Sequence, residues 1–293
     1  MNEIPKAKSK KQKILLVEGG GMRGAFSGGA LAAMCKYYPA KNFDLALGVS
    51  AGSCSLAYYI TEDTDKLISK KNILKIWSEE LHSHKFISFR ELLKLKRIMK
   101  REYLVDYIIK EKYKLILETL SKKPFFITVT NLKTAMPEYI RATKENFFDL
   151  LRSAISLPVA TKGFNFFDNR FFSDGGIIDP IPLKAVIESG YKDITLVLNH
   201  PRDYISEPVS KFLSKLSFPK NPLLQKILQY SHHKEYNEAK HLIQNPPADI
   251  KLKIIDPKEK IPVGILTTKK EKIIQLMNHG WSVAEKEFQN FKQ

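Results

Sequence analysis

The sequence predicts an α/β fold in three layers, with helices on both faces of a mainly parallel central sheet. Residues 13–18 (KILLVE) form a short apolar run of the kind that parallel sheets bury, and residues 25–38 follow with a helical pattern. Residues 43–49 (FDLALGV) form a second apolar run, and another small-residue helix begins at Ser50 without an intervening loop. Strands and helices that alternate in this way are typical of a parallel sheet flanked by helices.

The alternation resumes after a lysine-rich insertion at about residues 64–123. Apolar residues in the insertion recur at spacings of three and four, most clearly in residues 92–99 and 103–120, so we expect amphipathic helices there. Further apolar runs typical of strands occur at residues 125–130, 171–173, 194–198 and 251–255. Residues 206–293 are otherwise mostly helical, with a closing helix through Met277 and Trp281, and we expect this region to pack on the core.

The first 12 residues are basic, and the apolar run that follows them is too short for the core of a signal peptide. We expect residues 1–12 to form a disordered, solvated tail of a cytoplasmic protein. Charged residues interrupt every apolar run before it reaches the roughly 18 residues that a membrane-spanning helix needs. The sequence therefore predicts no transmembrane segment.

The formal net charge is +17, from 48 basic and 31 acidic residues, and only eight of the basic residues are arginine. No helix-turn-helix, zinc-finger or RNA-recognition motif accompanies this charge, which argues against a nucleic-acid partner. A peripheral role at anionic membrane surfaces and a compositional bias towards lysine both remain open. Cys35 and Cys54 lie in apolar surroundings and the seven histidines are dispersed, so we predict reduced thiols and no metal site.

A Gly-x-Ser-x-Gly pentapeptide, Gly48-Val49-Ser50-Ala51-Gly52, lies between the second predicted strand and its helix. This is the setting of a nucleophile elbow, in which a sharp turn exposes a reactive serine and flanking glycines relieve crowding. The nearby helix N-terminus favours negative charge that develops around the hydroxyl. We therefore predict that Ser50 is a nucleophile and that Gly48 and Gly52 form its elbow.

A glycine-rich loop follows the first predicted strand. Ser50 follows the second predicted strand, and the carboxyl ends of parallel strands meet at one edge of a sheet, so we expect the loop to lie next to Ser50. The loop comprises Gly19, Gly20, Gly21, Met22, Arg23 and Gly24. Backbone N–H groups that point into a crevice bind anions, and in acyl transfer the anion is the tetrahedral oxyanion. We predict that the loop forms an oxyanion hole, with Arg23 either bracing it or contacting a phosphate.

The loop also satisfies the Gly-x-Gly-x-x-Gly pattern of dinucleotide-binding proteins, and Asp44 lies 20 residues beyond Gly24. The acid that binds ribose belongs at the end of the second strand, whereas Asp44 precedes that strand. A nucleotide-binding regulatory protein is therefore kept only as an alternative.

Asp174-Gly175-Gly176 directly follows the apolar run at residues 171–173. An aspartate at a strand end, beside glycines that allow a neighbour to approach, is suited to accept a proton from a serine hydroxyl. We predict that Asp174 is the general base for Ser50 and that Gly175 and Gly176 complete its motif.

Together these motifs resemble those of the patatin-like phospholipase family, which carries a glycine-rich loop, GxSxG and DG[GA] in this order. Here they are EGGGMRG, GVSAG and DGG, and the resemblance covers about residues 13–200. It implies a patatin-like hydrolase domain at residues 13–205. It also implies a serine acyl hydrolase that cleaves acyl chains from lipids or phospholipids through a Ser50–Asp174 dyad, with an oxyanion hole at Gly19–Gly24 and without a cofactor.

The sequence departs from the family pattern at two positions. Glu18 replaces the usual aspartate before the glycines, and Asp179 stands where many members have asparagine. Neither change removes a reacting group. Weaker similarities are the small-residue stretch at residues 153–158 (SAISLP) and the DPIP that follows DGG.

Three alternatives stay open at this point. An α/β-hydrolase triad could combine Ser50, Asp174 and His200, since His200 follows a predicted strand. A lipid-binding relative with an idle dyad is the non-catalytic alternative. The aromatic stretch at residues 163–172 fits either an acyl-chain pocket or a hairpin packed on the core. The sequence does not determine the oligomeric state or the natural substrate.

Overall fold

The computed structural model describes residues 3–61, 66–94, 96–121, 123–259 and 262–289. In this part of the chain one sheet has the strand order β5-β6-β3-β2-β1-β7-β8, and β4 pairs with β3. The strands are β1 (Lys13–Val17), β2 (Leu45–Val49), β3 (Phe125–Asn131), β4 (Met136–Arg141), β5 (Asn165–Phe167), β6 (Arg170–Asp174), β7 (Asp193–Val197) and β8 (Lys251–Ile255). Strands β1, β2, β3, β7 and β8 pair in parallel, whereas β4, β5 and β6 pair antiparallel. The predicted mainly parallel sheet is confirmed.

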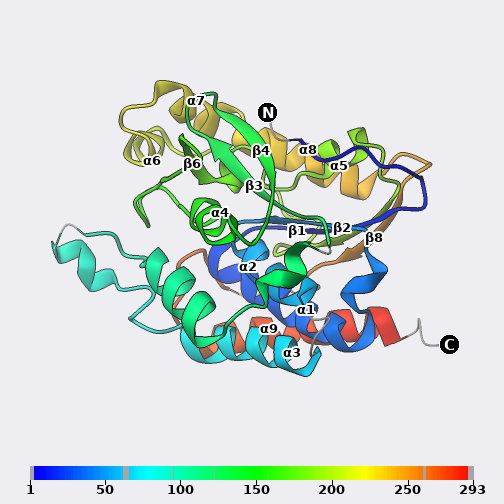
Figure 1. Ribbon diagram of the computed structural model, residues 1–293. Coiled ribbons are helices and arrows are strands. Elements are labelled where there is room, and N and C mark those ends of the chain that lie inside the picture. Colours follow the sequence, from blue (N-terminus) through cyan, green and yellow to red (C-terminus); the bar gives the residue numbers. More distant parts are fainter. Residues whose placement is uncertain (1–2, 62–65, 95, 122, 260–261, 290–293) are drawn as a thin grey trace.

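Helices cover both faces of the sheet, as Figure 1 shows. The α-helices are α1 (Ala25–Tyr37), α2 (Ala51–Ile60), α3 (Lys66–Lys75), α4 (Phe147–Ala154), α5 (Leu183–Glu188), α6 (Lys211–Ser217), α7 (Pro222–Tyr230), α8 (His232–Gln244) and α9 (Lys270–Gln289). Alternate residues of a strand point to opposite faces, so Leu15 and Val17 join the core beneath α1, α2 and α9, while Ile14 and Leu16 join the core beneath α5 and α8. The predicted three-layer α/β/α architecture is therefore confirmed.

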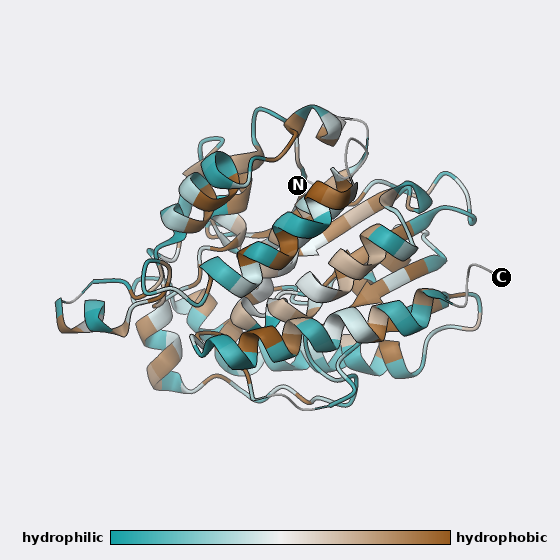
Figure 2. Ribbon diagram, turned by 90° about the horizontal axis from the view of Figure 1, so that it is seen from below, coloured by the Kyte–Doolittle hydropathy of each residue, from teal (hydrophilic) through white to brown (hydrophobic). Residues whose placement is uncertain are grey.

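Helices α1 and α9 cross with their backbones in contact on the lower face, which Figure 2 shows from below. A Cβ atom added at Gly29 would lie 1.8 Å from the carbonyl oxygen of Met277, and one added at Gly280 would lie 2.0 Å from that of Phe26. Only glycine leaves room for carbonyl groups at these distances. The pair of glycines therefore fixes the C-terminal helix against the first helix of the chain.

We expect Gly280→Ala to lower the free energy of unfolding by about 1–3 kcal/mol, because overpacking costs more than the better helix propensity of alanine returns. Urea unfolding followed by circular dichroism measures the change. Asn278→Ala is the matched control, since Asn278 is exposed on the same helix and its replacement adds no contact. If both variants unfolded at the same urea concentration, the close crossing of α1 and α9 would be wrong.

The lysine-rich insertion is less regular than its sequence predicts. After α3 it forms π-helical turns at Ile76–Glu80 and Tyr103–Lys112 and short 3-10 turns at Phe89–Lys94 and Leu117–Ser121. The helix expected over residues 92–99 is wrong, because Ile87 and Met99 pair in a β-bridge that buries both side chains. The parts of the prediction that fall on residues 64–65, 95 and 122 lie outside the described residues.

The N-terminal segment also differs from expectation. Residues 3–12 are largely exposed but are not a free tail, because the side chain of Ile4 is buried and the Ala7 N–H donates to the Ser189 carbonyl (2.8 Å) at the end of α5. At the other end, the strand predicted at residues 251–255 is confirmed, since β8 pairs in parallel with β7 in the central sheet. Among the described residues no helix combines the length and the apolar character needed to cross a membrane.

Candidate active site

Ser50 lies at the junction of β2 and α2, where the backbone turns sharply from strand to helix. Its φ and ψ angles are 50° and −129°, a conformation that few non-glycine residues adopt. The neighbouring backbone crowds this turn, and a Cβ atom at Gly52 would lie 2.5 Å from the Glu18 carbonyl oxygen. The strained serine at a strand-to-helix turn is the geometry of the predicted nucleophile elbow.

Asp174 is the last residue of β6 and is almost completely buried, with 1% of its surface exposed. The Ser50 hydroxyl donates to its Oδ2 (2.5 Å), and the Gly176 N–H donates to its Oδ1 (2.9 Å). Burial raises the pKa of Asp174 from 3.8 to about 7, although both hydrogen bonds favour the ionised form. A carboxylate with this pKa, bonded to a serine hydroxyl, is poised to accept a proton near neutral pH.

The position of Asp174 follows from the antiparallel pairing of β6 with β3. The pairing sets Asp174 opposite Val129, and a Cβ atom at Gly175 would lie 2.4 Å from the Thr128 carbonyl oxygen. The segment 153–158, which resembles the family's small-residue stretch, also holds Asp174 in place. The carbonyl of Ser156 accepts from the Asp174 N–H (3.3 Å) and from the Ser173 hydroxyl (2.9 Å).

The glycine-rich loop lies against Ser50, as the parallel pairing of β1 and β2 predicts. A Cβ atom at Gly19 would lie 3.0 Å from that of Ser50, and Gly20 and Gly21 have φ angles of 148° and 57°. Two backbone N–H groups of the loop already donate hydrogen bonds within the protein. The Met22 N–H donates to the Ile265 carbonyl (3.0 Å), and the Arg23 N–H donates to the Gly20 carbonyl (3.2 Å). Met22 and Arg23 are therefore not free oxyanion donors through their amides.

Residues that the sequence analysis missed hold this loop in place. The buried side-chain amide of Asn199 donates to the carbonyls of Glu18 (2.7 Å) and Gly19 (3.0 Å). The C-terminal region also contributes, because the Arg23 Nε donates to the Val263 carbonyl (3.2 Å) beside the bond from Met22 to Ile265. Asn199 and residues 263–265 carry no motif, so the sequence offers no signal for this role.

His200 pairs with Glu18. Its Nδ1 lies 3.0 Å from the Glu18 Oε1, which also accepts from the Tyr236 hydroxyl (2.7 Å). Burial opposes ionisation of Glu18, but interaction with His200 and Lys240 and the bond from Tyr236 hold its pKa below the usual range. No hydrogen bond between His200 and Ser50 or Asp174 occurs in the described part of the chain, and the geometry of a catalytic triad is not seen.

The dinucleotide alternative also lacks the required geometry. Asp44 lies just before β2, and its Oδ2 accepts from the Lys13 N–H (2.7 Å) at the start of β1. The glycine-rich loop follows the opposite end of β1, so a ribose cannot contact both groups in the way that dinucleotides do. Among the described residues there is also no cluster of three or more histidine, cysteine, aspartate or glutamate side chains that could hold a metal ion.

Comparison with known families identifies the chain. The family model described as patatin-like phospholipase matches residues 15–187, which contain the glycine-rich loop, Ser50 and Asp174. The chain belongs to the patatin-like phospholipase family. A second family model, a domain of unknown function (DUF6363), matches residues 222–293, the part of the chain that contains α7, α8, β8 and α9.

Individual relatives are distant from this patatin-like chain. An uncharacterized protein of Escherichia coli K12, YjjU, is 25% identical over 261 residues, covering 83% of this chain and 68% of its own length. The crystal structure of VipD from Legionella pneumophila superposes with a TM-score of 0.53 at 13% identity, over 99% of this chain and 70% of VipD. Human GIVD cytosolic phospholipase A2, solved with a fluorophosphonate inhibitor, gives a TM-score of 0.43 at 11% identity. The superposition covers 97% of this chain and 59% of the human chain. The likeness to VipD shows the fold.

Two cavities of the patatin-like chain meet at Ser50. An apolar pocket runs beneath the insertion and is lined by Tyr58, Ile76, Trp77, Phe86, Met99 and Leu104, among others. A second cleft has a mixed lining that includes Arg23, His200, Tyr204, His232 and Tyr236, and we call it the polar cleft after these side chains. Ser50, Gly21 and Leu157 line both cavities. Ser50 therefore stands between an apolar wall and a wall that also carries polar groups.

The aromatic stretch at residues 163–172 forms the hairpin of β5 and β6, and within the described residues none of it lines the apolar pocket. Asp168 and Asn169 provide its two-residue turn with positive φ angles of 51° and 55°. Phe172 is buried in the core, whereas Phe166 and Phe171 contact each other with their rings tilted by 53° and are half exposed. The hairpin interpretation of this stretch is therefore confirmed.

Proposed function

We propose that this chain is a serine acyl hydrolase that cleaves acyl esters of lipids by a Ser50–Asp174 dyad. The observation that carries the proposal is the hydrogen bond of 2.5 Å from the Ser50 Oγ to the Asp174 Oδ2, made where the apolar pocket meets the polar cleft. The acyl chain occupies the apolar pocket, and the alcohol part of the ester occupies the cleft. Membership of the patatin-like phospholipase family supports a lipid ester as the substrate.

In the proposed acylation step the Ser50 Oγ attacks the ester carbonyl carbon while Asp174 accepts the hydroxyl proton. The tetrahedral intermediate collapses, the C–O bond to the alcohol breaks, and Asp174 returns the proton to the leaving oxygen. In deacylation a water from the cleft attacks the acyl-enzyme, Asp174 accepts the water proton, and Ser50 leaves with a proton restored. The two half-reactions regenerate the free enzyme and release one alcohol and one fatty acid.

The oxyanion that forms in both steps needs donors on the side of Ser50 that faces the glycine-rich loop. Gly20 and Gly21 are the best candidates, because Gly20 lines the cleft, Gly21 lines both cavities, and the next two amides are bonded within the protein. One such donor typically contributes about 3–4 kcal/mol to lowering the barrier. The bond from Met22 to Ile265 fixes the loop that presents them.

A fluorophosphonate probe is expected to label Ser50, because an activated serine attacks the phosphorus and displaces fluoride. The labelling rate should follow ionisation of Asp174, whose pKa is about 7, and fall about tenfold for each pH unit below that value. Mass spectrometry locates the label, and rates are measured between pH 5 and pH 9. Failure of the folded protein to react at pH 8 would instead favour a lipid-binding protein with an idle dyad.

A further inference from the structure

The outer face of helices α6 and α7 is an exposed surface that the proposed chemistry does not use. Large apolar side chains stand in solvent along it, and Phe212 is 77% exposed. The others are Leu213, Leu216, Leu223 and Tyr230. Five exposed large apolar side chains on two neighbouring short helices are typical of an interaction surface. We refer to residues 211–230 as the outer helix pair.

The charge of the outer helix pair has one sign. Residues 208–234 contain five lysines and no aspartate or glutamate, although the chain as a whole carries 31 acidic residues. Lys211, Lys215 and Lys220 are exposed among the apolar side chains. A basic surface interleaved with exposed apolar residues is typical of segments that lie on anionic membranes.

The inner face of the same helices reaches the active site. Phe218, Leu224 and Leu228 are buried in a small core together with Ile177. Leu228 and Ile177 also line the polar cleft beside Ser50. The outer helix pair is therefore the outer side of a wall whose inner side faces the proposed reaction.

A second basic and apolar projection starts from the wall of the apolar pocket. Phe89 and Leu93 are exposed on the short turn Phe89–Lys94, with Arg90 and Lys94 beside them. The segment that carries this turn begins after Phe86 and ends at Met99, and both of these residues line the apolar pocket. In Figure 1 the turn (turquoise) and α6 project from the same end of the molecule, and Figure 2 shows the turn at that end as well.

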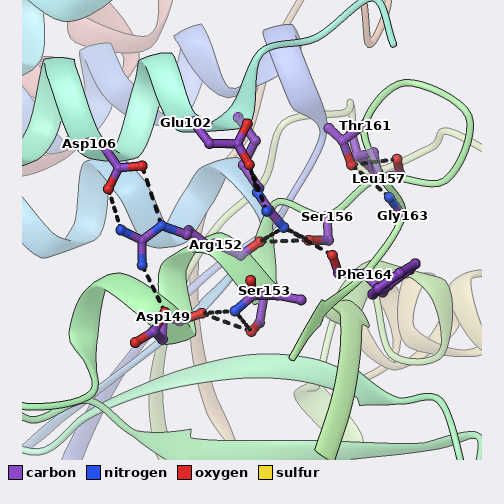
Figure 3. Close-up of polar contacts among 12 residues, drawn as sticks. Glu102, Asp106, Asp149, Arg152, Ser153, Ser156, Leu157, Thr161, Gly163 and Phe164 are labelled. Carbon is purple, nitrogen blue, oxygen red and sulfur yellow. Dashed lines mark hydrogen bonds and ion pairs between the residues drawn. The ribbon is translucent and has the colours of Figure 1, made fainter. Parts of the chain in front are cut away.

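Buried polar contacts fix the base of the second projection. The Arg101 guanidinium donates to the Ser156 hydroxyl (2.7 Å) and to the Phe164 carbonyl (3.1 Å). Arg152 of α4 donates to Asp106 of the π-helical segment and to Asp149 of its own helix, as Figure 3 shows. The projection is therefore attached to the segment that supports Asp174, and its position relative to the active site is set by these bonds.

We propose that the outer helix pair, together with the turn Phe89–Lys94 at the same end of the molecule, docks on an anionic lipid bilayer and brings the active site to its substrate. The proposal rests on the proposed lipid hydrolase function and names the form in which the substrate is met. Lysines in each projection match the charge of acidic headgroups, and the exposed apolar side chains enter the headgroup boundary. A second copy of this basic chain would place like charges opposite one another, which disfavours self-association through this face.

Vesicle co-sedimentation of the full chain in the Ser50→Ala background measures docking without hydrolysis. Vesicles of phosphatidylglycerol and phosphatidylcholine are expected to bind the protein, more strongly than pure phosphatidylcholine vesicles and less strongly as salt rises. Phe212→Ser with Leu216→Ser should weaken binding about tenfold, because two exposed apolar side chains are lost from the interface. Lys211→Gln with Lys215→Gln should weaken it about thirtyfold at low salt, from about 1 kcal/mol for each lysine.

The matched control is Lys270→Gln with Lys286→Gln, which removes the same charge from exposed positions on α9 and should change binding less than about twofold. Equal binding by the outer-helix variants and their parent would overturn the proposal. So would a dimer in solution that the Phe212 and Leu216 changes dissociate. With Ser50 restored, hydrolysis of a soluble short-chain ester reports on the dyad alone, so failure of the hydrolase function and failure of docking are distinguishable.

Discussion

Replacing Ser50 by alanine is expected to reduce ester hydrolysis by at least about a thousandfold, and loss of a nucleophile in serine hydrolases often costs more, about 10⁶-fold. The expectation follows from the position of the hydroxyl, which bonds to Asp174 (2.5 Å) and faces both cavities. The fold should persist, because only one oxygen is removed from a site with open space beside it. Hydrolysis of a chromogenic short-chain ester measures the change.

Ser53→Ala is the matched control for the nucleophile. Ser53 is buried on the same helix, and within the described residues its hydroxyl has no hydrogen-bond partner. Its loss should therefore leave hydrolysis close to the starting rate. Wild-type activity in the Ser50 variant, or equal losses in both variants, would contradict the assignment of the nucleophile.

Replacing Asp174 by asparagine should separate activity from stability. Hydrolysis is expected to fall by about 10²–10⁴-fold, the usual contribution of a general base. Above neutral pH the asparagine variant is expected to be more stable than the wild-type protein, because asparagine carries no charge to bury. The folded wild-type protein holds the Asp174 proton more tightly than its unfolded chain does. The pKa is raised from 3.8 to about 7, so the wild-type protein loses stability as pH rises through this window, by roughly 4 kcal/mol once Asp174 is ionised.

Thermal unfolding at pH 4 and at pH 8 measures the stability effect. Near pH 4 the carboxyl is largely protonated in the folded protein, and the variant should differ little from wild type. At pH 8 the variant should unfold at the higher temperature. An equal difference at both pH values would show that ionisation of Asp174 does not cause it.

His200→Ala is the comparison that separates the dyad from a triad. His200 bonds to Glu18, and no bond joins it to Ser50 or Asp174 in the described structure. Its loss should therefore change hydrolysis only by a small factor, because the proposed proton transfer does not pass through imidazole. A collapse of activity in a folded His200 variant would favour the triad instead.

The central sheet was predictable because its parallel strands are buried on both faces. Residues 13–18, 43–49 and 194–198 each contain a short apolar run, and runs of this kind are typical of buried parallel strands. The antiparallel strand β4 (Met136–Arg141) was missed, because MPEYIR mixes a proline and charged residues and resembles a loop. These residues form a strand because they pair with β3, and a local sequence pattern does not show such pairing.

The candidate site residues could be singled out for a related reason. Ser50 and Asp174 each lie at the end of a strand with glycines close by, so local sequence marks both positions. The supporting residues carry no such mark. Asn199 contacts the loop across 180 residues of sequence, and Ile265 contacts Met22 across more than 240, so only the folded chain shows these contacts. The irregular insertion was mispredicted because burial of Met99 selected an extended backbone over helical spacing.

The contacts from residues 263–265 to the glycine-rich loop bear on where this chain can be divided into domains. The loop belongs to the segment matched by the patatin-like family, whereas residues 263–265 belong to the segment matched by the domain of unknown function. A boundary drawn between the two families would cut through the contacts that hold the glycine-rich loop beside Ser50. In this chain the two segments therefore form one structural unit around the candidate active site.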